Sequence, residues 1–268
     1  MVKSNKTRNK KTRNKKTRNK KTRNKKKKTR ESMRDKLLKK SKEEYIKNKP
    51  IAKNFTILLK KIIKDMKKMN IEASLFGLMY KLKSQKSLAD KYSRIMKRQN
   101  VTLNEATKLV KDGIRFTIVF PKEKYVDGVL NVWSQLLKND FNSITRKGKD
   151  EIRWDVGDGY QGINTLISND NDTSIEIQFH TKNSIKYKDK LLHPLYEKLR
   201  KNCDEKLSLK EMEEKLKKSN INPKCISYKK DLIRAEKKIP IPERIKKCKS
   251  LKKKNNRIND LKSCQFIT

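Results

Sequence analysis

Apolar residues recur at intervals of three and four in two segments of the N-terminal third of the chain. The first segment is residues 34–45 and the second is residues 51–69. The second carries a continuous stripe, formed by Ile51, Phe55, Leu58, Leu59, Ile62, Ile63, Met66 and Met69. This spacing places side chains on one face of a helix. We therefore expect two helices, the second of which buries one face.

Alternation of apolar and polar residues predicts strands in two other segments. In GIRFTIVF the apolar positions are Ile114, Phe116, Ile118 and Phe120, and the polar ones are Arg115 and Thr117. In SIEIQFHT the apolar positions are Ile175, Ile177 and Phe179, and the polar ones include Glu176, Gln178 and His180. Successive side chains of a strand point to opposite faces. Each segment therefore predicts a strand with one apolar and one polar face.

The remaining patterns complete an α+β fold of α/β-like character. Extended patterns predict strands over residues 74–82, 141–147 and 160–168. Helical spacing predicts helices over residues 87–98, 104–110, 123–138, 184–199 and 208–218, with Asn104 near the cap of the second. Interleaved helices and strands indicate a mixed β-sheet flanked by helices. We place this domain at residues 45–202, followed at residues 203–268 by a basic, helical and partly disordered extension that frays after the IPIP sequence.

Positive charge is concentrated at the N-terminus of a chain that is basic throughout. The 268 residues carry a net charge of +44, and residues 1–30 hold 17 Lys and Arg and no acid. They contain KTRNK four times in succession, a repeat too short to form a supersecondary unit. We expect residues 1–32 to be a disordered basic arm. Such an arm suits RNA binding or nuclear targeting, and a solvated extension left by repeat slippage explains it equally well.

The apolar runs and the cysteines indicate the cellular compartment of the protein. No apolar run approaches the roughly 18 residues of a membrane span, and the N-terminus has no signal-peptide segment. We expect a cytoplasmic protein, or a nuclear or nucleolar one if the arm directs it in a eukaryotic host. The cysteines are widely spaced without a C-x-x-C pair, at Cys203, Cys225, Cys248 and Cys264. Free thiols are therefore expected.

Candidate chemistry gathers in a stretch without positive charge, residues 159–181. Its strand carries Glu176, Gln178 and His180 on one face. An ordinary solvent-facing strand has such a face, but the other polar faces of this chain are rich in lysine. A carboxylate in a row without lysine suits a cleft in which it holds a metal or accepts a proton.

Phosphate-binding residues are indicated at a strand-to-helix junction. The segment YKLKSQKSLADK places Lys81, Lys83, Ser84 and Ser87 at the start of a helix. Backbone N–H groups at a helix start, with lysines beside them, form a site for phosphate. On the neighbouring strand, the guanidinium of Arg115 can stack on a base or clamp a phosphate. Tyr160 follows two glycines in GDGYQG, so its ring can project towards a flat ligand.

Four blocks of this sequence, in this order, resemble the RelA/SpoT synthetase family, the pyrophosphokinases that make alarmones such as (p)ppGpp. KLKSQKSLADK matches the family's R-x-K-S-x-x-S-x-x-x-K with Lys81 in place of the arginine. The other blocks are Gly113-Ile114-Arg115, DGYQGINT (158–165) and EIQFHT (176–181). The sequences IQFHT and HPLYEKLR look closest to the corresponding segments of the divergent, toxin-associated branch. The resemblance covers about residues 50–200.

The resemblance implies a nucleotidyltransferase-like fold and a reaction in which the pyrophosphate of ATP passes to the 3′-hydroxyl of an acceptor purine nucleotide. It implies Mg²⁺ held by Asp112 and Glu176, of which Glu176 helps to deprotonate the hydroxyl. The implied ATP-binding residues are Lys81, Lys83, Ser84, Ser87, Lys91 and Arg115. Tyr160 would stack on the acceptor base, and the other acceptor-binding residues would be Asn164, Gln178, His180 and His193.

Departures from the family pattern leave alternatives open. The family's metal-binding Asp lies five residues before the arginine, where this chain has Val110, whereas Asp112 lies three before it and shares that parity on a strand. Gln161, Asn164 and His180 stand in place of arginine, histidine and arginine, which leaves the acceptor undefined. The chain could be an inactive nucleotide- or RNA-binding relative, or a pyrophosphokinase acting on an RNA 3′ end.

The two histidines of the chain set a further limit. A packing role for His193 is as good an interpretation as a catalytic one. The alarmone hydrolase domain found beside many synthetases needs several histidines around a metal, and this chain has only two. We therefore expect a synthetase without a hydrolase domain.

Overall fold

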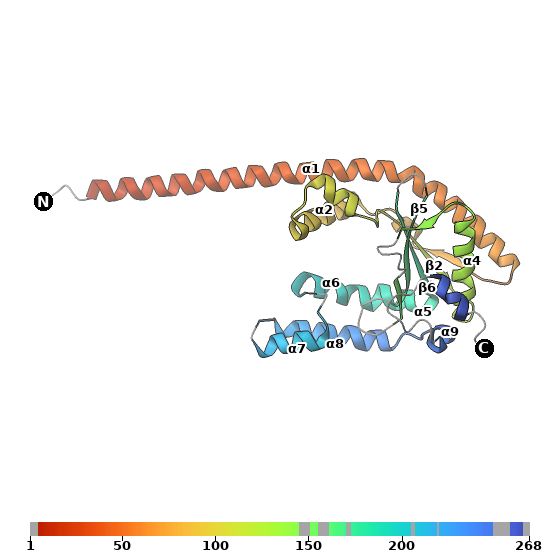
Figure 1. Ribbon diagram of the computed structural model, residues 1–268. Coiled ribbons are helices and arrows are strands. Elements are labelled where there is room, and N and C mark those ends of the chain that lie inside the picture. The colour runs from red at the N-terminus through yellow and green to blue at the C-terminus, as the bar shows by residue number, and fades with distance from the viewer. Residues whose placement is uncertain are drawn as a thin grey trace. The chain divides into compact units, whose positions relative to one another are not determined.

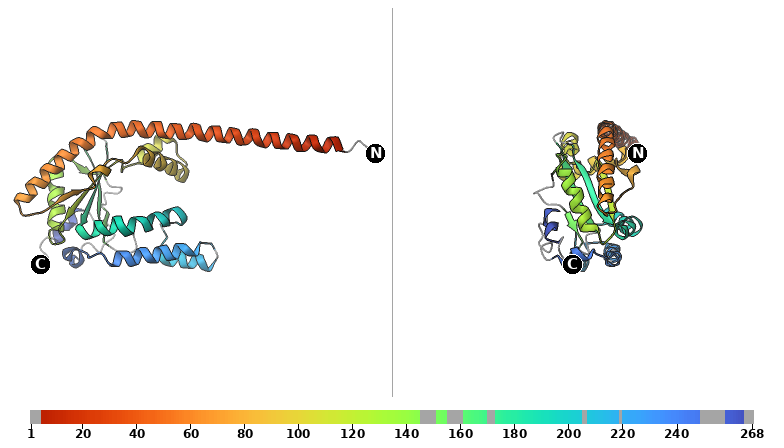
Figure 2. Two further views of the ribbon diagram at one scale, coloured as in Figure 1. Left: turned by 180° about the vertical axis from the view of Figure 1, so that it is seen from behind. Right: turned by 90° about the vertical axis from the view of Figure 1, so that its right-hand side faces the viewer.

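The computed structural model describes residues 5–144, 151–154, 161–169, 173–204, 207–218, 220–248 and 258–264. The chain divides into two compact units (Figure 1 and Figure 2). Unit 1 comprises residues 1–48 and 83–110, and unit 2 comprises residues 49–82 and 111–268. The predicted domain limits at residues 45, 202 and 203 stay predictions.

A single helix, α1 (Asn5–Lys68), contributes to both units. It covers the helices predicted over residues 34–45 and 51–69, of which the second ends at Lys68. Residues 5–32, for which we expected a disordered arm, are helical in the structure. The reason is composition: the chain holds no Gly or Pro before Pro50, and Lys and Arg are good helix formers. Pro50 lies inside the helix and lacks the N–H that would bond to the preceding turn, but the helix continues past it.

Unit 1 has a small core of its own. Helices α2 (Gln85–Gln99) and α3 (Leu103–Leu109) complete the unit. Its buried side chains are Leu37, Leu88, Ala89 and Tyr92, with Met96, Leu103 and Val110 packed against them. Helix α3 begins at a capping box of Thr102 and Glu105, so its cap is Thr102 and not Asn104.

Unit 2 contains a mixed sheet, as the sequence predicted, with six strands among the described residues. The strands are β1 (Ser74–Phe76), β2 (Ile114–Phe120), β3 (Asn142–Ser143), β4 (Glu151–Arg153), β5 (Gly162–Ser168) and β6 (Ile175–Thr181). Their order is β1-β2-β6-β5-β3, with β4 also paired to β5. β2 and β6 are parallel, and the other pairs are antiparallel. β6 therefore lies in the middle of the sheet, where every one of its residues is buried.

The described helices of unit 2 that follow α1 differ from prediction in several places. They are η1 (Leu78–Tyr80), α4 (Tyr125–Leu137), α5 (Lys182–Tyr187), η3 (Lys188–Leu192), α6 (His193–Asn202), α7 (Leu209–Lys217), α8 (Pro223–Lys237), α9 (Glu243–Lys247) and η5 (Ile258–Cys264). The strand predicted over 74–82 ends early, because Gly77 turns the chain at φ 63° into the 3-10 helix η1. The helix predicted over 184–199 is interrupted by η3, which is π-helical. Helices α8, α9 and η5 and strand β4 were not predicted as separate elements.

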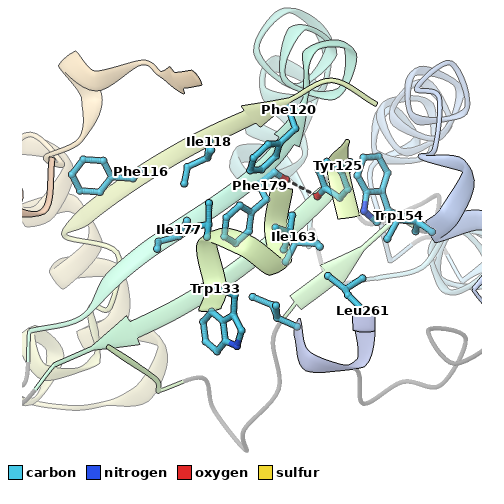
Figure 3. Close-up of a cluster of buried hydrophobic side chains, with 14 of the residues drawn as sticks. Phe116, Ile118, Phe120, Tyr125, Trp133, Trp154, Ile163, Ile177, Phe179 and Leu261 are labelled. Atoms are coloured by element: carbon cyan, nitrogen blue, oxygen red, sulfur yellow. Dashed lines mark hydrogen bonds between the residues drawn. The ribbon is translucent and has the colours of Figure 1, made fainter. Parts of the chain in front are cut away.

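The apolar face of the sheet carries the main core (Figure 3). Phe116, Ile118, Ile177 and Phe179 are buried there, as the alternation predicted. The rings of Phe55 in α1 and Phe116 in β2 lie 5.1 Å apart. Helix α4 follows β2, and the buried hydroxyl of its first residue, Tyr125, donates a 2.9 Å hydrogen bond to the carbonyl of Phe179. The second part of α1 and helix α4 therefore close the apolar face and leave the opposite face for polar residues.

The C-terminal segment is part of unit 2, and the expectation of free thiols was wrong. Disulfides join Cys203 to Cys225 and Cys248 to Cys264. Ile258, Leu261 and Cys264, in a segment expected to fray, are fully buried. The two cysteines of each pair are 22 and 16 residues apart in the sequence, and these separations do not by themselves show which cysteines pair. Closing loops of this size stabilises the fold by about 3 kcal/mol each.

Arg244 provides a second attachment for the same segment. Its Nη1 donates to both carboxylate oxygens of Asp127 in α4, at 2.8 and 2.9 Å. In the part of the chain that the structure describes, no helix is long and apolar enough to cross a membrane.

Close packing of α4 on β2 makes Gly128 a test of the fold. A Cβ at this position would lie 2.4 Å from the ring of buried Phe120. We expect Gly128→Ala to lower the melting temperature. Overpacking costs about 1–3 kcal/mol, which exceeds the gain of about 1 kcal/mol in helix propensity. Ser134→Ala, on the exposed side of α4, is the control and should not destabilise. If Gly128→Ala melts no lower than the wild type, the packing is looser than described.

Candidate functional site

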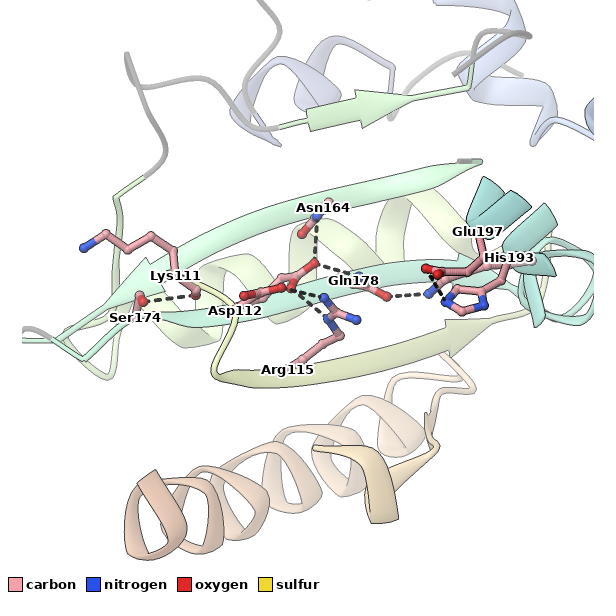
Figure 4. Close-up of polar contacts among 10 residues, drawn as sticks. Lys111, Asp112, Arg115, Asn164, Ser174, Gln178, His193 and Glu197 are labelled. Carbon is pink, nitrogen blue, oxygen red and sulfur yellow. Dashed lines mark hydrogen bonds and ion pairs between the residues drawn. The ribbon is translucent and has the colours of Figure 1, made fainter. Parts of the chain in front are cut away.

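Three neighbouring strands bring polar residues together on one face of the sheet in unit 2 (Figure 4). In the parallel pair β2–β6, Arg115 lies opposite Glu176 and Thr117 lies opposite Gln178. In the antiparallel pair β5–β6, Asn164 lies opposite Gln178. Because side chains alternate along each strand, this register places the polar groups on the side away from the main core.

Glu176 is the centre of this polar cluster. The residue is only 4% exposed. Its Oε1 accepts hydrogen bonds from Nε2 of Gln178 at 2.7 Å and from Nδ2 of Asn164 at 2.9 Å. Its Oε2 accepts from Nε of Arg115 at 2.7 Å. A buried carboxylate is tolerated when it is paired and hydrogen-bonded in this way, and the contacts fix its orientation.

Asp112 joins the cluster through the same guanidinium. Nη2 of Arg115 lies 3.1 Å from Oδ2 of Asp112, so Arg115 bridges the two carboxylates. Asp112 lies beside Arg115, but the strand alternation that we expected to place it there is not the reason. It precedes β2, so strand alternation does not position it. The loop is instead held near β6 by Ser174, whose Oγ donates 3.0 Å to the carbonyl of Lys111 (Figure 4).

The oxygen atoms of the cluster fit Mg²⁺ only together with a substrate. Oδ1 of Asn164 is buried, and no donor within the described residues reaches it. The described residues include no group of three or more His, Cys, Asp and Glu side chains that could hold a metal alone. Mg²⁺ is usually held by one or two carboxylates together with substrate phosphates. Asp112 and Glu176 therefore fit Mg²⁺ that enters with a phosphorylated substrate.

Lys188 belongs to the cluster, although the sequence patterns did not indicate it. Its Nζ donates to Oε1 of Gln178 at 2.6 Å. Burial lowers the pKa of Lys188 to about 8, helped by the positive charge of Arg115 and opposed by Asp189 and Glu176. In a segment with four lysines in nine residues, no sequence signal distinguishes this lysine from its exposed neighbours.

His180 lies at the end of the predicted Glu–Gln–His row but makes different contacts. It is completely buried, with Nδ1 3.0 Å from Oγ of Ser184 at the start of α5. The backbone of Gly162 packs on its ring, because a Cβ there would lie 3.0 Å from it. Burial lowers the pKa of His180 well below its usual range, as does the charge of Lys188, so the ring is neutral. Acceptor binding by His180 stays a prediction.

His193 is the first residue of α6, and its side chain is 64% exposed. Its Nε2 lies 4.0 Å from Oε1 of Glu197, which is also paired with Arg200 (Figure 4). Exposure excludes the packing role that the sequence left open. Binding of an acceptor by His193 stays a prediction.

The residues predicted to bind ATP are divided between the two units. Lys81 belongs to unit 2, where its carbonyl accepts a 2.8 Å hydrogen bond from the backbone N–H of Arg115. Four others belong to unit 1, namely Lys83, Ser84, Ser87 and Lys91. The predicted helix start is present, because Ser84 caps α2 and its Oγ accepts from the N–H of Ser87 at 3.2 Å. Tyr160 lies outside the described residues. ATP binding and base stacking stay predictions.

Comparison with known proteins gives similarities at the level of structure only. No protein-family model and no curated protein matches the sequence. Small alarmone synthetase 1 from Bacillus subtilis is 16% identical, with a TM-score of 0.45, over 72% of this chain and 86% of that one. A GTP pyrophosphokinase family protein from Streptococcus pneumoniae is 16% identical, with a TM-score of 0.45, over 84% of this chain and 96% of that one.

A third similar structure is the complex of the Type VI effector Tas1 with its immunity protein. The identity is 14% and the TM-score 0.36, over 76% of this chain and 94% of that one. At these identities the function of the present chain rests on its own residues.

The neutral state of His180 predicts how stability depends on pH. The unfolded chain binds a proton at this residue near pH 6.5, whereas the folded chain does so only at much lower pH. Stability contributed by the neutral ring is therefore present above pH 6.5 and is lost as the pH falls. We expect a loss of about 1.4 kcal/mol between pH 7.5 and 5.5. Denaturant unfolding of wild type and His180→Asn at both pH values measures it, and an equal change in both proteins would contradict the assignment.

Proposed function

We propose that this protein is a nucleotide pyrophosphokinase, which transfers the pyrophosphate of ATP to the 3′-hydroxyl of an acceptor purine nucleotide. One arrangement carries the proposal: the buried carboxylate of Glu176, oriented by Arg115, Asn164 and Gln178 beside a second carboxylate, Asp112. The four sequence blocks of the RelA/SpoT order support it. A polar face made only for solubility would not need a buried, fully oriented carboxylate.

The reaction requires a group that receives a proton. The acceptor oxygen forms a bond to the β-phosphorus of ATP, the bond from that phosphorus to the α,β-bridging oxygen breaks, and AMP leaves with the electron pair. The hydroxyl proton passes to Glu176. An ionised carboxylate has about four acceptor positions. Three are filled by Gln178, Asn164 and Arg115, so Oε2 keeps a position for the hydroxyl.

Positioning and charge neutralisation supply most of the catalysis in phosphoryl transfer. Asp112 would hold Mg²⁺, which supplies neutralisation of the phosphate charge when it is bound. Glu176 is the second predicted ligand, but its one open position can take either the cation or the hydroxyl, and the proposal gives it to the hydroxyl. Lys81 and Arg115, joined through their backbones, would hold the ATP phosphates from unit 2. The family resemblance also assigns phosphate binding to the start of α2, where backbone N–H groups and positive charge suit an anion, through Lys83, Ser84, Ser87 and Lys91.

The acceptor side is less defined by the contacts. Asn164 and Gln178 present amides on the polar face, and the oxygen of Asn164 suits a hydroxyl donor of a ribose. Tyr160, His180 and His193 would complete the acceptor site, as the family resemblance implies. Amide groups give directional hydrogen bonds, so Asn164 and Gln178 would contribute to the choice of acceptor.

The test is incubation of the full chain and Mg²⁺ with γ-labelled ATP and each purine nucleotide. A pyrophosphokinase releases one AMP for each labelled acceptor, whereas a kinase or an ATPase releases ADP. Formation of AMP in step with labelled acceptor supports the proposal. If ATP and acceptor bind but no AMP forms with any acceptor, the chain is an inactive nucleotide-binding relative.

Glu176→Gln should abolish transfer. The amide keeps the shape of the side chain but can neither receive the proton nor bind a cation strongly, so we expect a fall in kcat of about 10²–10⁴-fold. The melting temperature and ATP affinity of the variant separate this effect from unfolding. Glu213→Gln makes the same change at an exposed position in α7 and should keep full activity. Turnover by Glu176→Gln at the wild-type rate would refute the assignment.

A second candidate acceptor is the 3′ end of an RNA. The observation in its favour is the charge of residues 1–30, which hold 17 Lys and Arg and no acid. A polycation of this density binds a polyanion with release of counterions. The chemistry of the transfer would be unchanged, and the basic segment would recruit the substrate.

Deletion of residues 1–30 tests this candidate. We expect weaker RNA binding and a flatter dependence of log Kd on log salt, because the slope falls by about 0.7 for each phosphate of a single strand that the protein no longer neutralises. Turnover of free nucleotides should change little. Fluorescence anisotropy with a labelled RNA at several salt concentrations measures the slope. An unchanged slope would exclude residues 1–30 from RNA binding.

A further inference from the structure

Lys188 occupies an unusual place in the chain. It is the first residue of the π-helical segment η3 (Lys188–Leu192), which interrupts the helices that follow β6. A π-helical turn changes the direction in which side chains leave a helix, and such turns are frequent at functional sites. The turn carries Lys188 to Gln178 on the polar face, whereas Lys190 in the same segment is exposed.

The contact of Lys188 decides which way the amide of Gln178 points. A primary amide has an oxygen that accepts and a nitrogen that donates, and a lysine ammonium only donates. Because Nζ of Lys188 lies 2.6 Å from Oε1 of Gln178, the oxygen must face the lysine. Nε2 must then face Glu176, whose Oε1 it reaches at 2.7 Å. The reversed amide would present an oxygen to the carboxylate and a nitrogen to the ammonium, which are both repulsive contacts.

The unfavourable free energy of desolvating the charge of Lys188 argues against a purely structural role. Burial lowers its pKa from 10.5 to about 8, which shows that the fold disfavours its charge. Arg115 adds a second positive charge to the same face. Lys188 is half-buried, and a neutral side chain would fill the same space without the cost of desolvating a charge. The retained ammonium is therefore explained by the groups that it orients.

We propose that Lys188 is a positioning residue for Glu176, which acts by fixing the amide of Gln178. The inference rests on the proposed function, because positioning matters only if Glu176 takes part in the reaction. Lys188 does not contact the substrate in this proposal. Its influence reaches the carboxylate through two hydrogen bonds in series, from Lys188 to Gln178 and from Gln178 to Glu176.

Kinetics of Lys188→Met and Lys188→Arg test the proposal. Methionine keeps the length of the side chain but removes the donors, so we expect kcat to fall about 10–100-fold while KM for ATP stays within about twofold. Arginine retains donors and should recover a large part of kcat. Lys190→Met removes the same charge from an exposed position two residues away and should behave as wild type. A fall in kcat with Lys190→Met equal to that with Lys188→Met would mean that general charge, not positioning, is measured.

A double-mutant cycle separates positioning through Gln178 from a direct effect. If Lys188 acts only through the amide, Lys188→Met should add little to the loss of kcat caused by Gln178→Leu. The kcat of the double variant should then lie within about twofold of that of the less active single variant. Effects on kcat that multiply in the double variant would show an independent role for Lys188 and would overturn the proposal.

One readout does not depend on activity. In wild type the side-chain amide protons of Gln178 should exchange slowly with solvent, since Nε2 is held by Glu176. In Lys188→Met they should exchange at least about tenfold faster, and in Lys190→Met they should be unchanged. NMR with Gln178→Leu to assign the signals measures this. Faster exchange in Lys188→Met, in a protein that forms no AMP, would refute the proposed function alone, whereas unchanged exchange would refute the positioning.

Discussion

A buried carboxylate on the central strand is the constraint on which the arrangement of unit 2 depends. Glu176 lies in β6, which is buried along its whole length, and an unpaired charge there would cost several kcal/mol. The neighbouring strands supply its partners in register, with Arg115 from β2 and Asn164 from β5. A slip of one residue between β2 and β6 would turn Arg115 towards the core. The ion pair and the sheet register therefore support each other.

The polar groups form one connected series. Asp112 contacts Arg115, Arg115 contacts Glu176, Glu176 accepts from Gln178, and Gln178 accepts from Lys188. Asp112, Arg115 and Glu176 alternate in charge, and the neutral amide of Gln178 links Glu176 to the positive Lys188, so opposite charges compensate one another at low dielectric. The same compensation holds each side chain in one orientation. In the proposed reaction these groups would be oriented before substrate binds, which is the condition under which fixed charges lower a barrier most.

Several parts of unit 2 stabilise the sheet without contributing to this series. The second part of α1 and helix α4 cover the apolar face, and the C-terminal segment is fastened to α4 by Arg244 and Asp127. Two disulfides close the helices and the segment that follow α6. Distant parts of the chain thus stabilise the strands that carry Glu176, although none of them contributes a group to the polar series.

The sequence by itself determined the strands β2, β5 and β6 and the helices α2 and α4, because period 2 and period 3.6 are local properties of the chain. It also determined that Arg115, Glu176 and Gln178 share a polar face. Only the tertiary structure decided that Lys188 joins them and that the cysteines pair, since a contact between distant residues leaves no periodic trace. The same holds for Asp112: its spacing suggested the site, but the loop and the guanidinium placed it there. For His180, the alternation of apolar and polar residues predicts which face of the strand carries the side chain. It cannot predict that the side chain is buried, because burial depends on the residues that pack over that face.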